Sequence, residues 1–287
     1  MRAGRRDVEI THPGKVLFPD DGITKADLAA YYRDAAGPMV PLVRDRPVSL
    51  QRFNAGIGRE GFFQKNVAKG VPGWVKRVEV PKKGGSLWHV LANDAATLVW
   101  LANQNAITPH VWLSRADHLE RPDRMIFDLD PVADEDFAIV RRTARELGEV
   151  LRQAGVQPFA MTTGSKGIHV VVPLRRRYGF DRVREAAVAV AEQVVERRPR
   201  ELTMEFYKRK REGRLFLDVN RNGYAATAVP PYAVRARPGA PVATPLGWEE
   251  LSDRRLTATR WTVRTVLDRD PDVWKDIGRA AGPLPKL

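Results

Sequence analysis

The chain has 287 residues, enough for one large domain or two small ones, and its 43% hydrophobic and 29% charged residues are ordinary for a soluble globular protein. It has no cysteine, so disulfides, zinc–thiolate sites and thiol catalysis are excluded. The net charge of +13 predicts a polyanionic partner, with nucleic acid ahead of an acidic membrane surface, unless the whole proteome is rich in arginine.

Membrane and export signals are missing from the sequence. No window approaches the roughly 18 apolar residues of a membrane span. The basic start, Met1 to Arg6, is not followed by an apolar stretch, so it does not read as a signal peptide. We therefore expect a soluble, cytoplasmic protein with no membrane partner.

The N-terminal part of the chain alternates short strands with helices. The clearest helix start is Thr24, which has Asp27 three residues later in a near capping box, and this helix should run to about Ala36. A second helix should begin after Asn93-Asp94, whose side chains can cap it. Strands are expected over residues 7–11, 16–18, 47–53, 74–80, 86–91 and 108–113, with a hairpin turn at 82–85.

Two long helices are predicted in the second part of the chain. Apolar residues at helical spacing place them over about 135–153 and 180–197. Strands are expected over residues 124–130, 159–162, 168–172 and 215–219. Because no repeat, low-complexity block or linker interrupts the chain, we predict a single domain over 1–287, with a division near residue 115.

Asp128 and Asp130 lie in a predicted strand that is otherwise apolar. Side chains alternate along a strand, so the two carboxylates share one face, roughly 7 Å apart, and the apolar residues between them face the interior. Carboxylates this close repel each other unless a cation lies between them, and paired divalent ions are the machinery of phosphoryl transfer. The plain alternative is that Asp130-Pro131 ends a strand and caps the next helix.

A small basic loop, Thr163 to Gly167, separates two of these strands. Glycines let backbone N–H groups approach an anion closely, and Ser165 and Lys166 add a hydroxyl and a positive charge. The loop leads into a strand rather than a helix, so it is not a Walker loop. A phosphate-binding loop and an ordinary glycine turn both fit this sequence.

Three predicted strands share one asymmetry. Each has an apolar face, and the opposite faces carry Asp128 and Asp130, His169, and Asp218. If the strands are neighbours in a sheet, three carboxylates and a histidine converge beside the Thr163–Gly167 loop. On a protein with a charge of +13, this pattern predicts a nucleotidyl transferase.

Other residues have an ordinary interpretation beside a functional one. Phe62-Phe63 fits a core edge or a stacking platform for bases, where each base would contribute roughly 1–3 kcal/mol. Lys15 and Lys25 flank a turn, as surface lysines often do. His110, in a short strand, fits a core or surface histidine.

The motifs resemble the three signature motifs of the archaeo-eukaryotic primase-polymerase superfamily. These motifs are Phe127-Asp128-Leu129-Asp130-Pro131, Thr163-Gly164-Ser165-Lys166-Gly167-Ile168-His169 and Phe216-Leu217-Asp218. Their order and context are most similar to the polymerase domain of bacterial ATP-dependent DNA ligase D, over nearly the whole chain. Further matching segments are Gly14–Pro19, Thr24-Lys25, Phe62–Lys65, Pro109–Val111 and Pro231–Arg235.

The resemblance implies an α/β (α+β) fold: a primase-polymerase catalytic core with a mixed β-sheet flanked by helices, plus an N-terminal α/β elaboration. It implies a template-directed repair polymerase that adds nucleotides, preferentially ribonucleotides, to a 3′-hydroxyl at gaps and double-strand-break ends in non-homologous end joining. Asp128, Asp130 and Asp218 would be the catalytic, metal-binding residues for two Mn²⁺ or Mg²⁺ ions. NTPs and dNTPs would be the substrates.

The resemblance also implies partners and roles for other residues. The expected partner is DNA with gaps or 3′ overhangs and a downstream 5′-phosphate, with Ku and a DNA ligase as further candidates, and the protein would be a nucleoid-associated monomer. Nucleotide binding is expected of Thr163, Ser165, Lys166, His169, His110, Arg235, Gln51, Arg52, Phe62 and Phe63. Binding of the 5′-phosphate or template is expected of Lys15, Lys25, Phe63, Arg211 and Arg221. On this basis residues 1–115 would bind DNA, and residues 116–287 would form the catalytic, palm-like part.

Three positions depart from the family's pattern. Gln51 stands where a lysine is expected near the nucleotide, Arg221 stands where relatives often carry a glutamine, and Thr163 replaces a common serine but keeps the hydroxyl. The chain also has no Lys-x-Asp-Gly ligase motif, which indicates a stand-alone polymerase or an excised domain.

Three rival functions stay open at this point. The first is a stand-alone primase-polymerase that fills short gaps in excision repair. The second is a non-catalytic module that binds DNA ends and holds them together through its basic face. The third, a metal-dependent phosphohydrolase, lacks the additional His and Asp ligands expected of that class.

Overall fold

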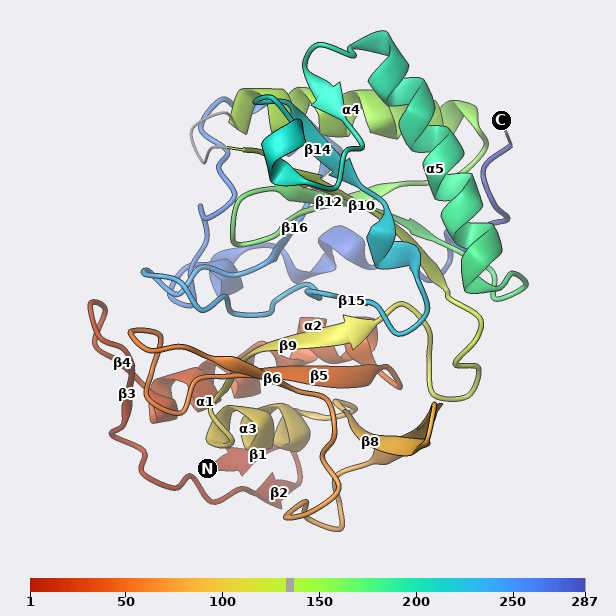
Figure 1. Cartoon of the computed structure of the whole chain (residues 1–287). Helices are drawn as coiled ribbons and strands as arrows, with labels where there is room; N and C mark the ends of the chain where they lie inside the picture. The colour runs from red at the N-terminus through yellow and green to blue at the C-terminus, as the bar shows by residue number, and fades with distance from the viewer. Residues whose placement is uncertain (133–136, 287) are drawn as a thin grey trace. The chain divides into compact units, whose positions relative to one another are not determined.

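The computed structural model describes residues 1–132 and 137–286, and the chain forms two compact units (Figure 1). Unit 1 contains residues 1–119, 227–243 and 261–270, and unit 2 contains residues 120–226, 244–260 and 271–287. The expectation from sequence placed everything after about residue 116 in one part, whereas two later segments pack within unit 1. The expected helix start near residue 135 lies outside the described residues.

Unit 1 is built on an antiparallel sheet with the strand order β15-β9-β5-β8-β7, and β6 pairs with β5. Its strands are β5 (Pro47–Arg52), β6 (Phe62–Gln64), β7 (Arg77–Lys82), β8 (Gly85–Leu91), β9 (Ala106–Trp112) and β15 (Thr227–Ala228). Two small hairpins are formed by β1 (Arg2–Ala3) with β2 (Arg6–Asp7), and by β3 (Val16–Phe18) with β4 (Ile23–Thr24).

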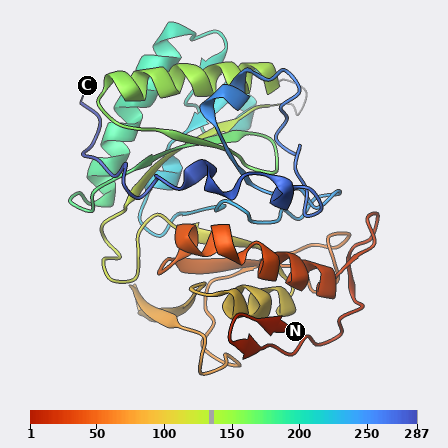
Figure 2. The ribbon, with the colours of Figure 1, turned by 180° about the vertical axis from the view of Figure 1, so that it is seen from behind.

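Helices cover one face of the sheet in unit 1. The helices are α1 (Lys25–Asp34), α2 (Ala36–Val43) and α3 (Ala95–Asn103). Helices α1 and α2 lie behind the sheet in Figure 1 and in front of it in Figure 2, and α3 packs on α1 and β9. The core of this unit therefore lies between the helices and the inner face of the sheet.

The start of α1 confirms the predicted capping box. The hydroxyl of Thr24 accepts a hydrogen bond from the Asp27 N–H at 3.2 Å, and the Asp27 carboxylate accepts one from the Thr24 N–H at 2.8 Å. The expected strand over residues 7–11 is wrong, because the observed strand β2 ends at Asp7. This strand pairs with β1 in a hairpin whose turn contains Gly4, with φ of 59°. Helix α2 was not predicted because it contains two prolines, of which Pro38 lies in the tolerant first turn.

Unit 2 is built on a mixed sheet with the order β13-β14-β10-β12-β11-β16. The strands are β10 (Arg124–Asp130), β11 (Phe159–Thr162), β12 (Ile168–Pro173), β13 (Leu202–Thr203), β14 (Leu215–Asp218) and β16 (Thr244–Leu246). Only β13 and β14 pair in parallel among the described strands of this sheet. The predicted mixed α/β architecture with helices flanking a sheet is confirmed.

Two long helices pack on the central strands of unit 2. They are α4 (Phe137–Gln153) and α5 (Phe180–Arg197), and each contacts β10, with α4 also contacting β12 and α5 (Figure 1). The inward residues of β10, Met125, Phe127 and Leu129, are completely buried. The apolar face predicted for this strand therefore forms the core, and the carboxylate face is the opposite one.

Short 3₁₀ helices complete the described part of the chain. They are η1 (Lys208–Lys210), η2 (Asn220–Asn222), η3 (Trp248–Ser252), η4 (Val266–Asp268) and η5 (Pro271–Trp274). Across residues 1–132 and 137–286, no helix combines the length and the apolar character that crossing a membrane demands.

Candidate active site

Strand β10 lies between β12 and β14, and it carries two of the predicted catalytic carboxylates. Asp128 is directly opposite His169 of β12 on one side and Asp218 of β14 on the other. Residues directly opposite each other in an antiparallel pair point to the same face, so these three side chains share one face. Asp130, opposite Phe216, follows on that face two residues later. The prediction that these strands are neighbours is confirmed.

Asp218 is held in place by the turn that follows it. Its Oδ1 atom accepts hydrogen bonds from the backbone N–H of Asn220 at 2.7 Å and from the Asn220 side chain at 2.8 Å. The next asparagine, Asn222, is completely buried and bonds both the N–H and the carbonyl of Ile126, at 2.8 and 2.7 Å. These contacts join helix η2 to β10 and fix the position of Asp218 beside Asp128.

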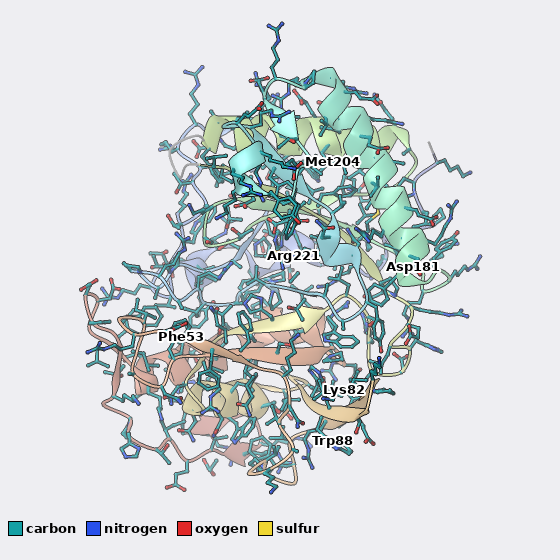
Figure 3. All side chains as sticks on the ribbon, viewed as in Figure 1. Phe53, Lys82, Trp88, Asp181, Met204 and Arg221 are labelled. Carbon is teal, nitrogen blue, oxygen red and sulfur yellow. The ribbon has the colours of Figure 1, made fainter. Side chains whose placement is uncertain are left out.

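Arg221, on the same short helix, lies against both of these carboxylates. Its Nε atom is 3.6 Å from Asp128 Oδ2 and 3.9 Å from Asp218 Oδ2. In Figure 3 it lies just beyond the end of β14. On the other side of Asp128, His169 Nε2 is 3.5 Å from Asp128 Oδ1. Two basic side chains therefore flank the Asp128–Asp218 pair.

Arg211 pairs with the third carboxylate and is itself firmly held. Its Nη1 atom is 3.3 Å from Asp130 Oδ2, and its other nitrogens donate to the carbonyls of Glu205 and Phe206 at 3.0 and 2.9 Å. The guanidinium also lies over the Phe216 ring at 3.9 Å, in cation–π contact. Arg211 is buried, so it is a structural part of the site and not an exposed surface residue.

The electrostatics of the cluster favour a bound cation. Burial raises the pKa of Asp130 above its ordinary value, the nearby charge of Asp128 raises it further, and Arg211 partly offsets both effects. A raised pKa means that the ionised carboxylate is disfavoured where it stands. Additional positive charge would therefore stabilise the ionised form of Asp130.

The donor set of the cluster fits a hard divalent cation. Carboxylate oxygens are the ligands that Mg²⁺ and Mn²⁺ prefer, and Asp128, Asp130 and Asp218 supply them from adjacent strands. In the part of the chain that the structure describes, no three His, Asp or Glu side chains are already arranged around a metal position. Several of the relevant oxygens face Arg211 and Arg221 instead.

The Thr163–Gly167 loop is tied together and pressed against β10. The Thr163 hydroxyl accepts hydrogen bonds from the backbone N–H groups of Ser165 and Gly167, at 3.3 and 3.2 Å. A Cβ atom on Gly167 would lie 1.8 Å from the carbonyl oxygen of Leu129, so only glycine permits this approach. Ser165 and Lys166 are half-buried. The loop therefore lies directly beside the Asp128–Asp130 strand, as its sequence position predicted.

Unit 1 contains a separate cluster of three basic side chains. Lys25 is 3% exposed, and its ammonium donates to the Asn103 carbonyl at 3.1 Å. Burial lowers its pKa, and the charges of Lys15 and Arg52 lower it further, so the three cations lie close enough to repel one another. Lys15 donates to the carbonyl of Asn54, whose side chain accepts from Arg52 at 3.4 Å. Such a cluster is suited to binding an anion.

The two adjacent aromatic residues of β6 face different surroundings. Phe62 lies opposite Arg52 of β5, and Phe63 lies opposite Gln51 of the same strand. Because neighbours along a strand point to opposite faces, the two rings lie on opposite faces of the sheet. The Arg52 guanidinium lies over the Phe62 ring at 5.5 Å, whereas the Phe63 ring is 5.2 Å from that of His110. Their exposed fractions are 45% and 54%, so neither is a core residue.

Arg235 is positioned by a buried network within unit 1. The carbonyl of Val234 accepts from the Thr108 hydroxyl at 2.6 Å, and its N–H donates to the Tyr32 hydroxyl at 3.1 Å. Tyr32 in turn donates to the carbonyl of Ile107 at 2.6 Å. The segment containing Arg235 is therefore fixed to β9, the strand that carries His110.

A family model for the LigD primase-polymerase domain matches residues 24–275, which is most of the chain. This chain belongs to the LigD primase-polymerase domain family. Its relatives include the multifunctional non-homologous end joining protein LigD of Mycolicibacterium smegmatis, 33% identical over 264 residues (91% of this chain, 34% of that protein). The protein of the same name from Pseudomonas aeruginosa is 34% identical over 281 residues (96% and 33%). The chain thus spans about a third of the length of these LigD relatives.

A solved LigD structure agrees with this assignment. The polymerase domain from Mycobacterium tuberculosis ligase D in complex with DNA matches with a TM-score of 0.86 and 30% identity, covering 96% of this chain and 99% of that chain. The resemblance to the ligase D polymerase domain drawn from sequence is therefore confirmed. The LigD primase-polymerase domain family is a family of nucleotidyltransferases.

Sequence reasoning missed two residues that shape this site. Asn220 and Asn222 are not among the predicted site residues, although they fix Asp218 and β10. Asn220 carries a detectable signal, because an Asp-x-Asn spacing allows a side chain to accept from the backbone two residues later. Asn222 carries none, since its partners are 96 residues away in the sequence.

Proposed function

We propose that this chain is a template-directed DNA repair polymerase that adds nucleotides to a 3′-hydroxyl at gaps and double-strand-break ends, in non-homologous end joining. The observation that carries the proposal is the register of β10, which puts Asp128, Asp218 and His169 on one face in a LigD primase-polymerase chain. The names of its relatives, which are non-homologous end joining proteins, support the pathway.

The three carboxylates are the catalytic residues in this proposal. Asp128, Asp130 and Asp218 hold two Mn²⁺ or Mg²⁺ ions. The chemistry supplied by such bound ions is a lowered pKa of the primer 3′-hydroxyl and neutralisation of the charge on the leaving pyrophosphate. Asn220 keeps Asp218 oriented, and the buried Arg211 limits the charge repulsion at Asp130.

Each unit contains residues that we propose for binding of a nucleotide. In unit 2, Ser165 and Lys166 bind its phosphates from the Thr163–Gly167 loop, with His169 beside Asp128. In unit 1, His110, Arg235, Gln51 and Phe63 bind its sugar, phosphates and base. His110 and Phe63 are in edge-to-face contact, which gives the base a preformed aromatic surface. A preference for ribonucleotides is part of the proposal.

The basic cluster of unit 1 binds the 5′-phosphate of the downstream strand. Without an anion, the positive charges of Lys15, Lys25 and Arg52 repel one another. A phosphate with two negative charges would reduce this repulsion and bind through charge-assisted hydrogen bonds. Arg52 therefore contributes to phosphate binding at the DNA end rather than to nucleotide binding. Phe62, which lies beneath Arg52, is assigned to the same DNA end.

Primer extension on gapped DNA tests the proposal. We would compare substrates with and without the downstream 5′-phosphate, Mn²⁺ with Mg²⁺, and rNTPs with dNTPs, using the wild type and Asp128→Ala. Templated extension should be lost in Asp128→Ala and kept in Asp181→Ala, which removes a carboxylate at the start of α5. A preference for the 5′-phosphate and for rNTPs is expected.

Other outcomes separate the rival functions. Extension that ignores the 5′-phosphate would favour a general gap-filling enzyme of excision repair. DNA-end binding without any extension, equal in the wild type and Asp128→Ala, would contradict the polymerase proposal and leave a module that holds DNA ends. Stimulation by Ku or a DNA ligase would support these proteins as partners.

A further inference from the structure

Arg221 lies where a cation bound between Asp128 and Asp218 would neutralise both carboxylates. Its Nε atom is 3.6 Å from one and 3.9 Å from the other. The two aspartates are cross-strand partners, and their side chains are only 15% and 11% exposed. Without a positive charge between them, two buried carboxylates at this spacing would repel each other strongly. The guanidinium of Arg221 therefore stabilises the pair in the metal-free protein.

The backbone around Arg221 is buried and fixed, whereas its side chain is half-exposed. The neighbouring Asn222 is completely buried and bonded to Ile126 and Val219, which fixes helix η2 against β10. The Arg221 side chain, in contrast, is 46% exposed. A long, half-exposed side chain on a fixed backbone can leave the carboxylates by rotating about its own bonds, without any change in the sheet.

A divalent cation and the Arg221 guanidinium need the same oxygen atoms. The Oδ2 atoms of Asp128 and Asp218 both face Arg221, so a divalent cation bound to them would lie close to the guanidinium, and two positive charges at such short range repel each other. The other basic groups differ in this respect. Arg211 is buried, held by two carbonyls and paired with Asp130, and His169 contacts only the Oδ1 atom of Asp128 in the ion pairs of the described residues.

We propose that Arg221 is an internal counter-ion that competes with divalent metal for Asp128 and Asp218, and so sets the metal affinity of the site. Metal binding displaces the guanidinium toward solvent. The inference rests on the proposed metal-binding role of these two aspartates. Its consequence is that this protein needs a higher concentration of divalent ion than it would with a neutral residue at position 221.

Direct metal binding tests this competition without reference to catalysis. We would titrate the full chain with Mn²⁺ and follow free Mn²⁺ by electron paramagnetic resonance, for the wild type, Arg221→Gln and Arg221→Lys. Removal of the competing charge should tighten Mn²⁺ binding about tenfold in Arg221→Gln, the size expected for losing a partly exposed ion pair with two carboxylates. Arg221→Lys, which keeps the charge, should stay within about threefold of the wild type.

Two control variants separate a local effect from a general one. Arg209→Gln removes one positive charge from the exposed η1 segment, and it should leave Mn²⁺ affinity unchanged. Asp218→Asn should weaken binding in the wild type and also in the Arg221→Gln background. As a second measurement, titration of ¹⁵N-labelled protein with Mg²⁺ should shift the Nε–H signal of Arg221 with the same midpoint as metal binding.

The outcomes distinguish failure of this inference from failure of the metal site. Equal Mn²⁺ affinity in the wild type and Arg221→Gln, with loss of binding in Asp218→Asn, would overturn the competition and leave the proposed metal site standing. An unchanged Arg221 Nε–H signal during metal binding would also overturn it. Absence of Mn²⁺ binding in every variant would overturn both proposals.

Discussion

Individual charged residues in this protein are placed at some cost to folding. Lys25 is buried beside Lys15 and Arg52, and Asp130 is half-buried beside Asp128. Burial and a neighbouring like charge lower the pKa of Lys25 and raise the pKa of Asp130, so in both cases they favour the uncharged form of the side chain. Such strained charges gather at functional sites, because each becomes favourable once the ligand of opposite charge is bound.

Replacement of Lys25 should separate stability from DNA binding. The lowered pKa of Lys25 means that the folded state binds fewer protons than the unfolded state, so the free energy of unfolding should rise as the pH increases toward 10.5, the ordinary lysine value. Lys25→Met lacks this titrating group. At pH 7 it should be as stable as the wild type or slightly more stable, and its stability should depend less on alkaline pH. Urea unfolding at pH 7 and pH 10 measures both effects.

The same variant should lose its preference for a 5′-phosphate. Fluorescence anisotropy with gapped DNA, phosphorylated or not at the downstream end, should show at least about a tenfold preference in the wild type, as expected for charge-assisted hydrogen bonds. Lys25→Met should bind the two DNAs alike, whereas Lys69→Met, at an exposed position, should behave as the wild type does. An intact preference in Lys25→Met would contradict the assignment of the phosphate site.

At the level of secondary structure, the close approach of the Thr163–Gly167 loop to β10 connects two motifs of the site. The loop carries Ser165 and Lys166, and β10 carries Asp128 and Asp130. Their spacing depends on Gly167, which leaves no room for a side chain against the carbonyl of Leu129. Gly167 is therefore needed for the close contact between the loop and β10.

Gly167→Ala should impair both stability and nucleotide binding. The added methyl group would have to push the loop away from β10, and overpacking of this kind costs about 2 kcal/mol. We expect a lower Tm and a KM for nucleotide raised several-fold, with a smaller change in kcat. Gly278→Ala, where no atom lies within 4 Å of the new methyl group, is the matched control in the same unit. An unchanged KM in Gly167→Ala would show that the loop does not position the nucleotide.

The elements that sequence could predict are those governed by local rules. The alternation along β10, β12 and β14 fixed which residues face the same way, and the cap at Thr24 depends on a contact three residues away. The same alternation places Phe62 and Phe63 on opposite faces, although both were expected to bind the nucleotide. Arg211 and Arg221 were predicted as DNA contacts, and their pairing with carboxylates depends on loop geometry that no local pattern encodes.

At the level of the whole molecule, the part of the chain after residue 226 alternates between the two units. Residues 227–243 and 261–270 pack in unit 1, while residues 244–260 and 271–287 pack in unit 2. Strand β15 thus extends the sheet of unit 1 and β16 extends that of unit 2, although 15 residues separate them in sequence. Periodicity could not predict this, because loop-rich segments with many prolines carry no helical or strand pattern.

The alternating chain path predicts that the two units unfold together. Tyr32→Phe removes a buried hydroxyl that bonds the carbonyl of Ile107 and the N–H of Val234, so it should lower the free energy of unfolding by about 1–2 kcal/mol. If unfolding of unit 1 releases segments that are covalently continuous with β16, the loss should extend to unit 2. Hydrogen exchange should then accelerate equally in β5 of unit 1 and β12 of unit 2, while Tyr207→Phe, at an exposed tyrosine, should change neither. Faster exchange confined to β5 would mean that the units unfold independently, so that a substitution in unit 1 leaves the stability of unit 2 unchanged.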